Sequence, residues 1–207
     1  MRKLLLLSFL FASPAWAAGV LVYDNPAQSG APSAVPYFSD VPLQVFDDAH
    51  TIGTGVLKGF DVWLWNHEGG PVGMSIAIYA GDAADGMPGA LLAGPYTVTA
   101  ISQTAIKFYH LDVSDAPLLD TTDLWFSVTS PVANAAAVWY GHDPTIGTSH
   151  NLLRIHDATG DWVDAGSSDP SGPANLRFAI YVDPAVQTEP KTWGKIKALY
   201  RGDPSIQ

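Results

Sequence analysis

The stretch Val-Gly-Met-Ser-Ile-Ala-Ile-Tyr at residues 72–79 alternates large apolar residues with small ones. Successive side chains of a β-strand point to opposite faces of the sheet, so this alternation predicts a strand with one apolar face. That face carries Val72, Met74, Ile76 and Ile78, while the small residues between them face away. An apolar sheet face must be covered by a second layer, and the stretch therefore predicts two packed sheets.

The same period of two recurs at residues 124–129 and 176–182. Clusters of Gly, Pro and Asp separate these stretches, and short alternating runs between turn residues are typical of antiparallel sandwiches. Residues 81–94, rich in Gly, Pro and Asp, are expected to form a long connection. The sequence thus predicts an all-β fold, an antiparallel two-sheet sandwich of jelly-roll-like type. Further strands, for a total of about ten, are expected at residues 19–23, 43–46, 56–65, 96–99, 106–113, 136–140 and 152–156.

The composition favours turns over helices and excludes several classes of function. The 207 residues include 20 acidic and 10 basic ones, and the only Glu residues are Glu68 and Glu189. Asp favours turns whereas Glu favours helices, and 19 Gly and 16 Pro add to the same preference. A formal net charge of −10 repels phosphate backbones and argues against a nucleic-acid partner. Because the chain has no Cys, thiol catalysis, disulfides and Cys-ligated zinc are excluded.

The N-terminus has the three parts of a secretory signal peptide. Arg2 and Lys3 precede an apolar run at residues 4–12, and Ala-Trp-Ala at residues 15–17 has the small-x-small pattern that signal peptidase recognises. We expect cleavage near Ala17 and a mature protein that is secreted or periplasmic. No Cys follows the cleavage site to carry a lipid. No later stretch approaches the roughly 20 apolar residues of a membrane-spanning helix, so no transmembrane span is expected.

The C-terminal segment differs in composition from the rest of the chain. Thr192 and Gly202 have the positions of a helix N-cap and a C-terminal stop, and apolar residues recur between them at helical spacing. We therefore expect a sandwich domain at residues 18–186, followed at 187–207 by a linker and one short amphipathic helix. This tail holds half of the basic residues of the mature chain: Lys191, Lys195, Lys197 and Arg201.

Recognised catalytic patterns are missing from the sequence. A glycosidase generally needs two carboxylates beside the scissile bond, and the one Glu of the predicted domain, Glu68, lies in a Gly-rich turn at residues 66–70. The chain contains neither G-x-S-x-G nor H-E-x-x-H. We therefore expect a protein that is not an enzyme, with an Asp-dependent glycoside hydrolase as a weaker alternative.

Metal ligands can be proposed only as local pairs. His110 and Asp112 are two residues apart on a predicted strand and so share a face, whereas a third ligand cannot be named. Calcium takes oxygen ligands and is the one cofactor left open by the paired Asp residues, although Asp is expected in turns without any ion. Besides His110 with Asp112, the pairs are His142 with Asp143, His156 with Asp157, Asp47 with Asp48, Asp82 with Asp85, and Asp161 with Asp164.

Aromatic residues are the strongest indication of a binding function. Trp63 and Trp65 share one face of a predicted strand, and Trp139 and Tyr140 precede a loop that contains His142. An exposed flat ring beside polar groups can cover the apolar face of a sugar, although aromatic residues also fill the cores of sandwiches. The candidate ligand-binding residues are Trp65, Trp139, Tyr140 and His142.

Packing and turn motifs follow one another in a fixed order along the predicted domain. They are Phe46-Asp47-Asp48, the strand 56–65, Ile78-Tyr79 with 86–92, 124–128, Gly160-Asp161-Trp162 and 176–181. In the order of these motifs, roughly residues 20–183 resemble a loose class of secreted bacterial β-sandwich proteins. The resemblance implies a jelly-roll-like, carbohydrate-binding-module-like fold, generally without known catalysis, and it transfers no functional residue.

These features lead to one hypothesis about function and one principal rival. The hypothesis is an exported, non-catalytic binding module for a glycan or a cell-surface polymer. The rival is a structural or adhesive surface protein that docks through its basic tail onto an acidic partner or membrane surface, an attraction that salt would weaken. The sequence does not determine the oligomeric state.

Overall fold

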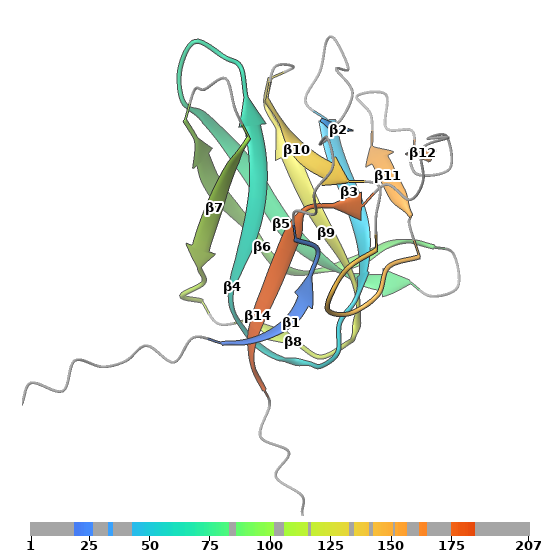
Figure 1. Cartoon of the computed structure of the whole chain (residues 1–207). Coiled ribbons are helices and arrows are strands. Elements are labelled where there is room, and N and C mark those ends of the chain that lie inside the picture. The colour runs from blue at the N-terminus through green and yellow to red at the C-terminus, as the bar shows by residue number, and fades with distance from the viewer. Residues whose placement is uncertain are drawn as a thin grey trace, which may run out of the picture.

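The structure is a computed structural model that describes residues 19–26, 33–34, 43–82, 86–101, 106–115, 117–132, 135–140, 143–150, 152–156, 162–164 and 175–184. This part of the chain is all-β, with strands and connections and no helix (Figure 1). Among these residues, accordingly, no helix is long and apolar enough to cross a membrane. The expected signal peptide at 1–17 and the expected helical tail at 187–207 lie outside the described residues.

The first of two antiparallel sheets has eight strands arranged around the long strand β4. Val62 of β4 pairs with Phe178 on one edge and with Tyr109 on the other, so β4 has neighbours on both sides. The path through this sheet is β1 (Val20–Asp24), β14 (Phe178–Pro184), β4 (Gly55–Asn66), β10 (Ala135–Tyr140) and β13 (Asn175–Leu176); β2 (Ser33–Ala34) pairs with β10, whereas β7 (Lys107–Asp112) and β8 (Leu118–Leu119) pair with β4.

The second antiparallel sheet has six strands, and β3 and β9 form its centre. Asp48 pairs with Trp125 and His50 with Asp123 in the register between these two strands. The order of the sheet is β12 (Trp162–Asp164), β11 (Leu153–His156), β3 (Leu43–His50), β9 (Asp123–Ser130), β5 (Val72–Asp82) and β6 (Met87–Ala100).

Aromatic rings from both sheets meet in the core. Phe126 of the six-stranded sheet stacks on Phe178 of the eight-stranded sheet with ring centroids 4.2 Å apart, and it contacts Phe60 edge-on at 5.7 Å. The two sheets therefore pack face to face in a sandwich-like arrangement. The apolar faces predicted for residues 72–79 and 124–129 are confirmed, because the core contains Val72, Met74, Ile76, Ile78, Leu124, Phe126 and Val128.

The prediction of a long connection at residues 81–94 is wrong, because β5 and β6 pair through this region as a hairpin. Their register runs from Val72 opposite Ala100 to Asp82 opposite Met87, with three shifts along the way. The Gly and Pro residues that suggested a loop are compatible with β6 because it is the last strand of its sheet. Pro88 and Pro95 lie within this edge strand, where a missing backbone donor is tolerated.

Candidate functional site

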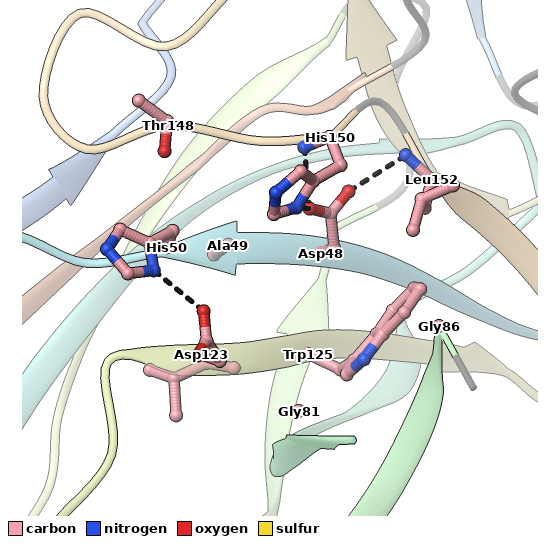
Figure 2. Close-up of a pocket in the computed structure, with 11 residues that line it drawn as sticks. Asp48, Ala49, His50, Gly81, Gly86, Asp123, Trp125, Thr148, His150 and Leu152 are labelled. Atoms are coloured by element: carbon pink, nitrogen blue, oxygen red, sulfur yellow. Dashed lines mark hydrogen bonds and ion pairs between the residues drawn. The ribbon is translucent and has the colours of Figure 1, made fainter. Parts of the chain in front are cut away.

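A pocket of about 630 Å³ opens on the face of the six-stranded sheet that points away from the core (Figure 2). The neighbours Ala49 and Leu124 belong to the core, so alternation along β3 and β9 turns the residues beside them to the opposite face. The pocket is lined by Asp48, Ala49, His50, Gly81, Gly86, Asp123, Leu124, Trp125, Thr148, His150 and Leu152. This volume is within the range of small-molecule sites, roughly 300–1,000 Å³.

The first polar feature of the pocket is the pair formed by His50 and Asp123. These residues are directly opposite in the β3–β9 register, and His50 Nδ1 lies 2.7 Å from Asp123 Oδ1. A dashed line in Figure 2 marks this contact. An ionised carboxylate can only accept a hydrogen bond, so the imidazole proton is on Nδ1. Neutral His50 then presents Nε2 as a hydrogen-bond acceptor.

The second polar feature is Asp48, which holds the loop at residues 148–152. The backbone N–H groups of His150 and Leu152 donate to its two carboxylate oxygens at 2.7 and 2.8 Å, and His150 Nδ1 lies 3.1 Å from Oδ2. The hydroxyl of Ser149 lies 3.0 Å from Asp48 Oδ1 and 2.7 Å from Asn175 Oδ1. Asp48 is buried. Its carboxylate therefore acts as an anchor for one wall of the pocket.

Close backbone approaches fix the other end of the loop. His50 and Thr148 exchange two backbone hydrogen bonds of 2.7 and 2.9 Å. Gly147 has φ +79°, and a Cβ at this position would lie 2.6 Å from the carbonyl oxygen of His50 and 2.8 Å from Cδ2 of Tyr23. A Cβ on Gly81 would lie 2.9 Å from that of Asp123. Glycine is needed where the backbones are this close.

The outer face of the eight-stranded sheet carries three neighbouring rings, Trp65, Trp63 and Phe108, which we call the aromatic row. Trp63 and Trp65 are partly exposed, and the Phe108 ring is 5.0 Å from the Trp63 ring across the β4–β7 pair. Phe108 is 51% exposed. The guanidinium carbon of Arg177 lies 3.8 Å above the Trp63 ring, and the rings of Trp65 and His67 are 4.2 Å apart.

A hydrogen-bond network borders the aromatic row. His110 Nδ1 lies 2.6 Å from Asp61 Oδ1, and the hydroxyl of Tyr181 donates to Asp61 Oδ2 at 2.6 Å. The hydrogen bond to Asp61 raises the pKa of His110, and Asp112, 3.2 Å from Nε2, raises it further. Burial and the hydrogen bond to Asp61 raise the pKa of Tyr181.

His110 and Asp112, which were considered as a pair of metal ligands on one strand face, lie within 3.2 Å of each other. Asp61 is closer to the imidazole, at 2.6 Å, and was not predicted. Its alternation with Trp63 and Trp65 along β4 would have placed it on this face. Within the described part of the chain, no group of three or more His, Asp or Glu residues could hold a metal ion. Asp47 and Asp48 do not converge on one site, because Asp47 lies on the core side of β3 and Asp48 on the pocket side.

Of the residues predicted to bind a ligand, the structure places Trp65 in the aromatic row. The backbones of Trp139 and Tyr140 lie in β10, opposite Leu176 and Asn175, and their side chains lie outside what the structure describes. His142 also lies outside the described residues. The pocket residues His50, Asp123 and Trp125 were not predicted as a site, because His50 comes from β3 and the other two come from β9, more than 70 residues further along the chain.

Comparisons of the chain with family models, with curated proteins and with solved structures find no match. The fold and the surface features define its class: an all-β protein of two packed antiparallel sheets, with a polar pocket on one outer face and an aromatic row on the other.

Proposed function

We propose that this protein is an exported glycan-binding module of jelly-roll-like, carbohydrate-binding-module-like architecture, and that the aromatic row holds a polysaccharide chain. The observation that carries the proposal is the grouping of Trp65, Trp63 and Phe108 on the outer face of the eight-stranded sheet. Flat apolar rings can cover the C–H faces of successive sugar units, while polar groups at the border contact the hydroxyls.

The border of the aromatic row supplies groups of suitable chemistry. His110 is about half exposed and is oriented by Asp61 on β4 and by Asp112 on its own strand. The guanidinium of Arg177 covers part of the Trp63 ring. Hydroxyl groups of a sugar both donate and accept hydrogen bonds, so they match a border that contains imidazole and carboxylate groups.

Retention on insoluble polysaccharides and affinity electrophoresis in soluble ones would test the proposal. Replacing Trp65 or Trp63 by Ala should weaken binding about fivefold each, because a well-packed ring contributes about 1 kcal/mol. Trp162→Ala is the matched control, since Trp162 is a partly exposed ring on the other sheet. Absence of retention on every polymer, or an equal loss in the control variant, would contradict the proposal.

A second candidate function, an Asp-dependent glycoside hydrolase, is favoured by one observation: Asp48 and Asp123 both line the pocket. Two carboxylates in one cleft are the basic requirement of glycoside hydrolysis. Against it, the Asp48 carboxylate already accepts hydrogen bonds from two backbone N–H groups and contacts His150, which suits an anchor better than a proton donor. Release of reducing ends from polysaccharides, abolished by Asp123→Asn, would establish this activity in place of simple binding.

A further inference from the structure

The side chains that line the pocket on the six-stranded sheet offer more hydrogen-bond acceptors than donors. Its charged side chains are two carboxylates, Asp48 and Asp123, and neither Lys nor Arg is among the described residues that line it. The chain as a whole also carries a formal charge of −10. An anionic ligand would therefore be repelled from the pocket, whereas a cation would be attracted.

The two imidazoles add to this excess of acceptors. His50 and His150 each direct Nδ1 toward a carboxylate, at 2.7 Å from Asp123 and 3.1 Å from Asp48. Because a carboxylate cannot donate, both neutral rings carry their proton on Nδ1 and have a lone pair on Nε2. The pocket side chains thus offer acceptors in both rings and in the carboxylate of Asp123.

The geometry points to a second binding site in this pocket, for a small polyol that bears a primary ammonium group. An ammonium has three donors and no acceptor, which matches the excess of acceptors, and its charge complements Asp123. The hydroxyls of the polyol donate to the imidazoles and to Thr148. The site lies on the sheet opposite the aromatic row, and the inference does not depend on the proposed polysaccharide function.

The remaining wall of the pocket suits the carbon skeleton of such a ligand. The ring of Trp125 lies between β3 and the segment that carries Gly81 and Gly86, and Leu152 faces it from the loop (Figure 2). Trp125 is only 2% exposed, so its ring supports the pocket from beneath and offers a ligand little surface of its own. A polyol chain can place its C–H groups beside the partly exposed Leu152 while its polar groups contact the histidine side.

Calorimetry with three probes of equal length tests the inference: glucamine, sorbitol and gluconate, which end in an ammonium, a hydroxyl and a carboxylate. At about pH 8, where imidazole is neutral, glucamine should bind at least tenfold more tightly than sorbitol because its hydrogen bonds are charge-assisted. Gluconate should not bind measurably. Equal binding of the three probes, or no binding of glucamine, would overturn the inference.

A substitution of Asp123 tests whether its negative charge is needed for binding while its hydrogen bond with His50 is kept. Asp123→Asn keeps an oxygen that accepts the hydrogen bond from His50 and removes the negative charge, and it should reduce glucamine affinity about tenfold. Asp120→Asn is the matched control, because Asp120 is exposed and does not line the pocket. Neither variant should alter polysaccharide retention by the aromatic row. An equal loss in both variants would show a general charge effect and overturn the site.

Discussion

The carboxylate of Asp47 accepts a hydrogen bond of 2.7 Å from the backbone N–H of Leu176, which lies 129 residues further along the chain. Asp47 belongs to β3 of the six-stranded sheet and Leu176 to β13 of the eight-stranded sheet, so this hydrogen bond joins the two sheets inside the core. The carbonyl of the same Leu176 accepts a hydrogen bond of 2.8 Å from the Asn25 side chain. Two buried polar side chains therefore satisfy backbone groups at the end of a short strand.

We expect Asp47 to make the protein less stable as the pH rises. Burial, and secondly the charge of Asp48, raise the pKa of Asp47 well above its usual value. The folded protein thus binds a proton more tightly here than the unfolded chain does, and stability falls from about pH 4 upward through the folded-state pKa. Urea unfolding at a series of pH values would measure this decline, which should be smaller in Asp47→Asn.

The Asn variant is informative because its carbonyl can still accept from Leu176. Asp47 Oδ1 makes no hydrogen bond in the described part of the chain, and the amide of an Asn would place a donor there instead. Asp47→Ala removes the acceptor and should lower stability by about 1–3 kcal/mol near pH 4. The loss should become smaller as the pH rises, because the variant also lacks the carboxyl that titrates. A pH slope that is the same in the native chain and in Asp47→Asn would show that this carboxyl is not responsible for it.

Gly147→Ala should destabilise the protein and loosen the pocket. The left-handed backbone at this residue and the approach of a Cβ to His50 and Tyr23 together should cost about 1–3 kcal/mol. Gly69→Ala is the matched control, since nothing lies within 4 Å of a Cβ there. Thermal unfolding of both variants would check this. If the two variants unfold at the same temperature, the loop at 147–148 does not depend on this close approach.

His110 should titrate above the ordinary imidazole value of about 6.5. Its hydrogen bond to Asp61 is the main cause of the raised pKa. The stability that this hydrogen bond contributes is fully present below the unfolded pKa and is lost as the pH rises through the folded value. Proton NMR of the His110 ring gives the pKa directly, and Asp61→Asn should lower it, whereas Asp115→Asn should not. An unchanged pKa in Asp61→Asn would assign the shift to another group.

The alternation of apolar and polar or small residues was sufficient to predict β5 and β9. It was insufficient for β3, where charged residues continue the strand. Residues 72–79 and 124–129 form β5 and β9 with the predicted faces buried. The strand expected at residues 43–46 is longer in the structure: β3 continues through Asp47 and Asp48 to His50, and each of the two carboxylates is buried against backbone donors from a distant segment. Such partners are fixed by the tertiary fold and leave no local signal.

The pocket could not be predicted for the same reason. His50 and Asp123 are 73 residues apart and meet only because β3 and β9 pair in one particular register. The aromatic row was partly predictable, since Trp63 and Trp65 share a face by alternation alone, whereas Phe108 joins them through the β4–β7 register. Alternation along one strand predicts which of its residues share a face. Which residues from different strands meet depends on the register between the strands, and local sequence does not determine that register.

Removal of the basic tail would decide between the glycan-binding proposal and the surface-protein rival. If the chain ending at Val186 loses association with cells while it still binds polysaccharide, the basic residues of 187–207 mediate docking. That docking should weaken as salt rises toward about 0.15 M, where the Debye length is about 8 Å. Substituting Lys195 and Lys197 by Gln in the full chain is the control for charge alone. Unchanged cell association of the truncated chain at low salt would reject the rival, because no other segment carries a comparable cluster of basic residues.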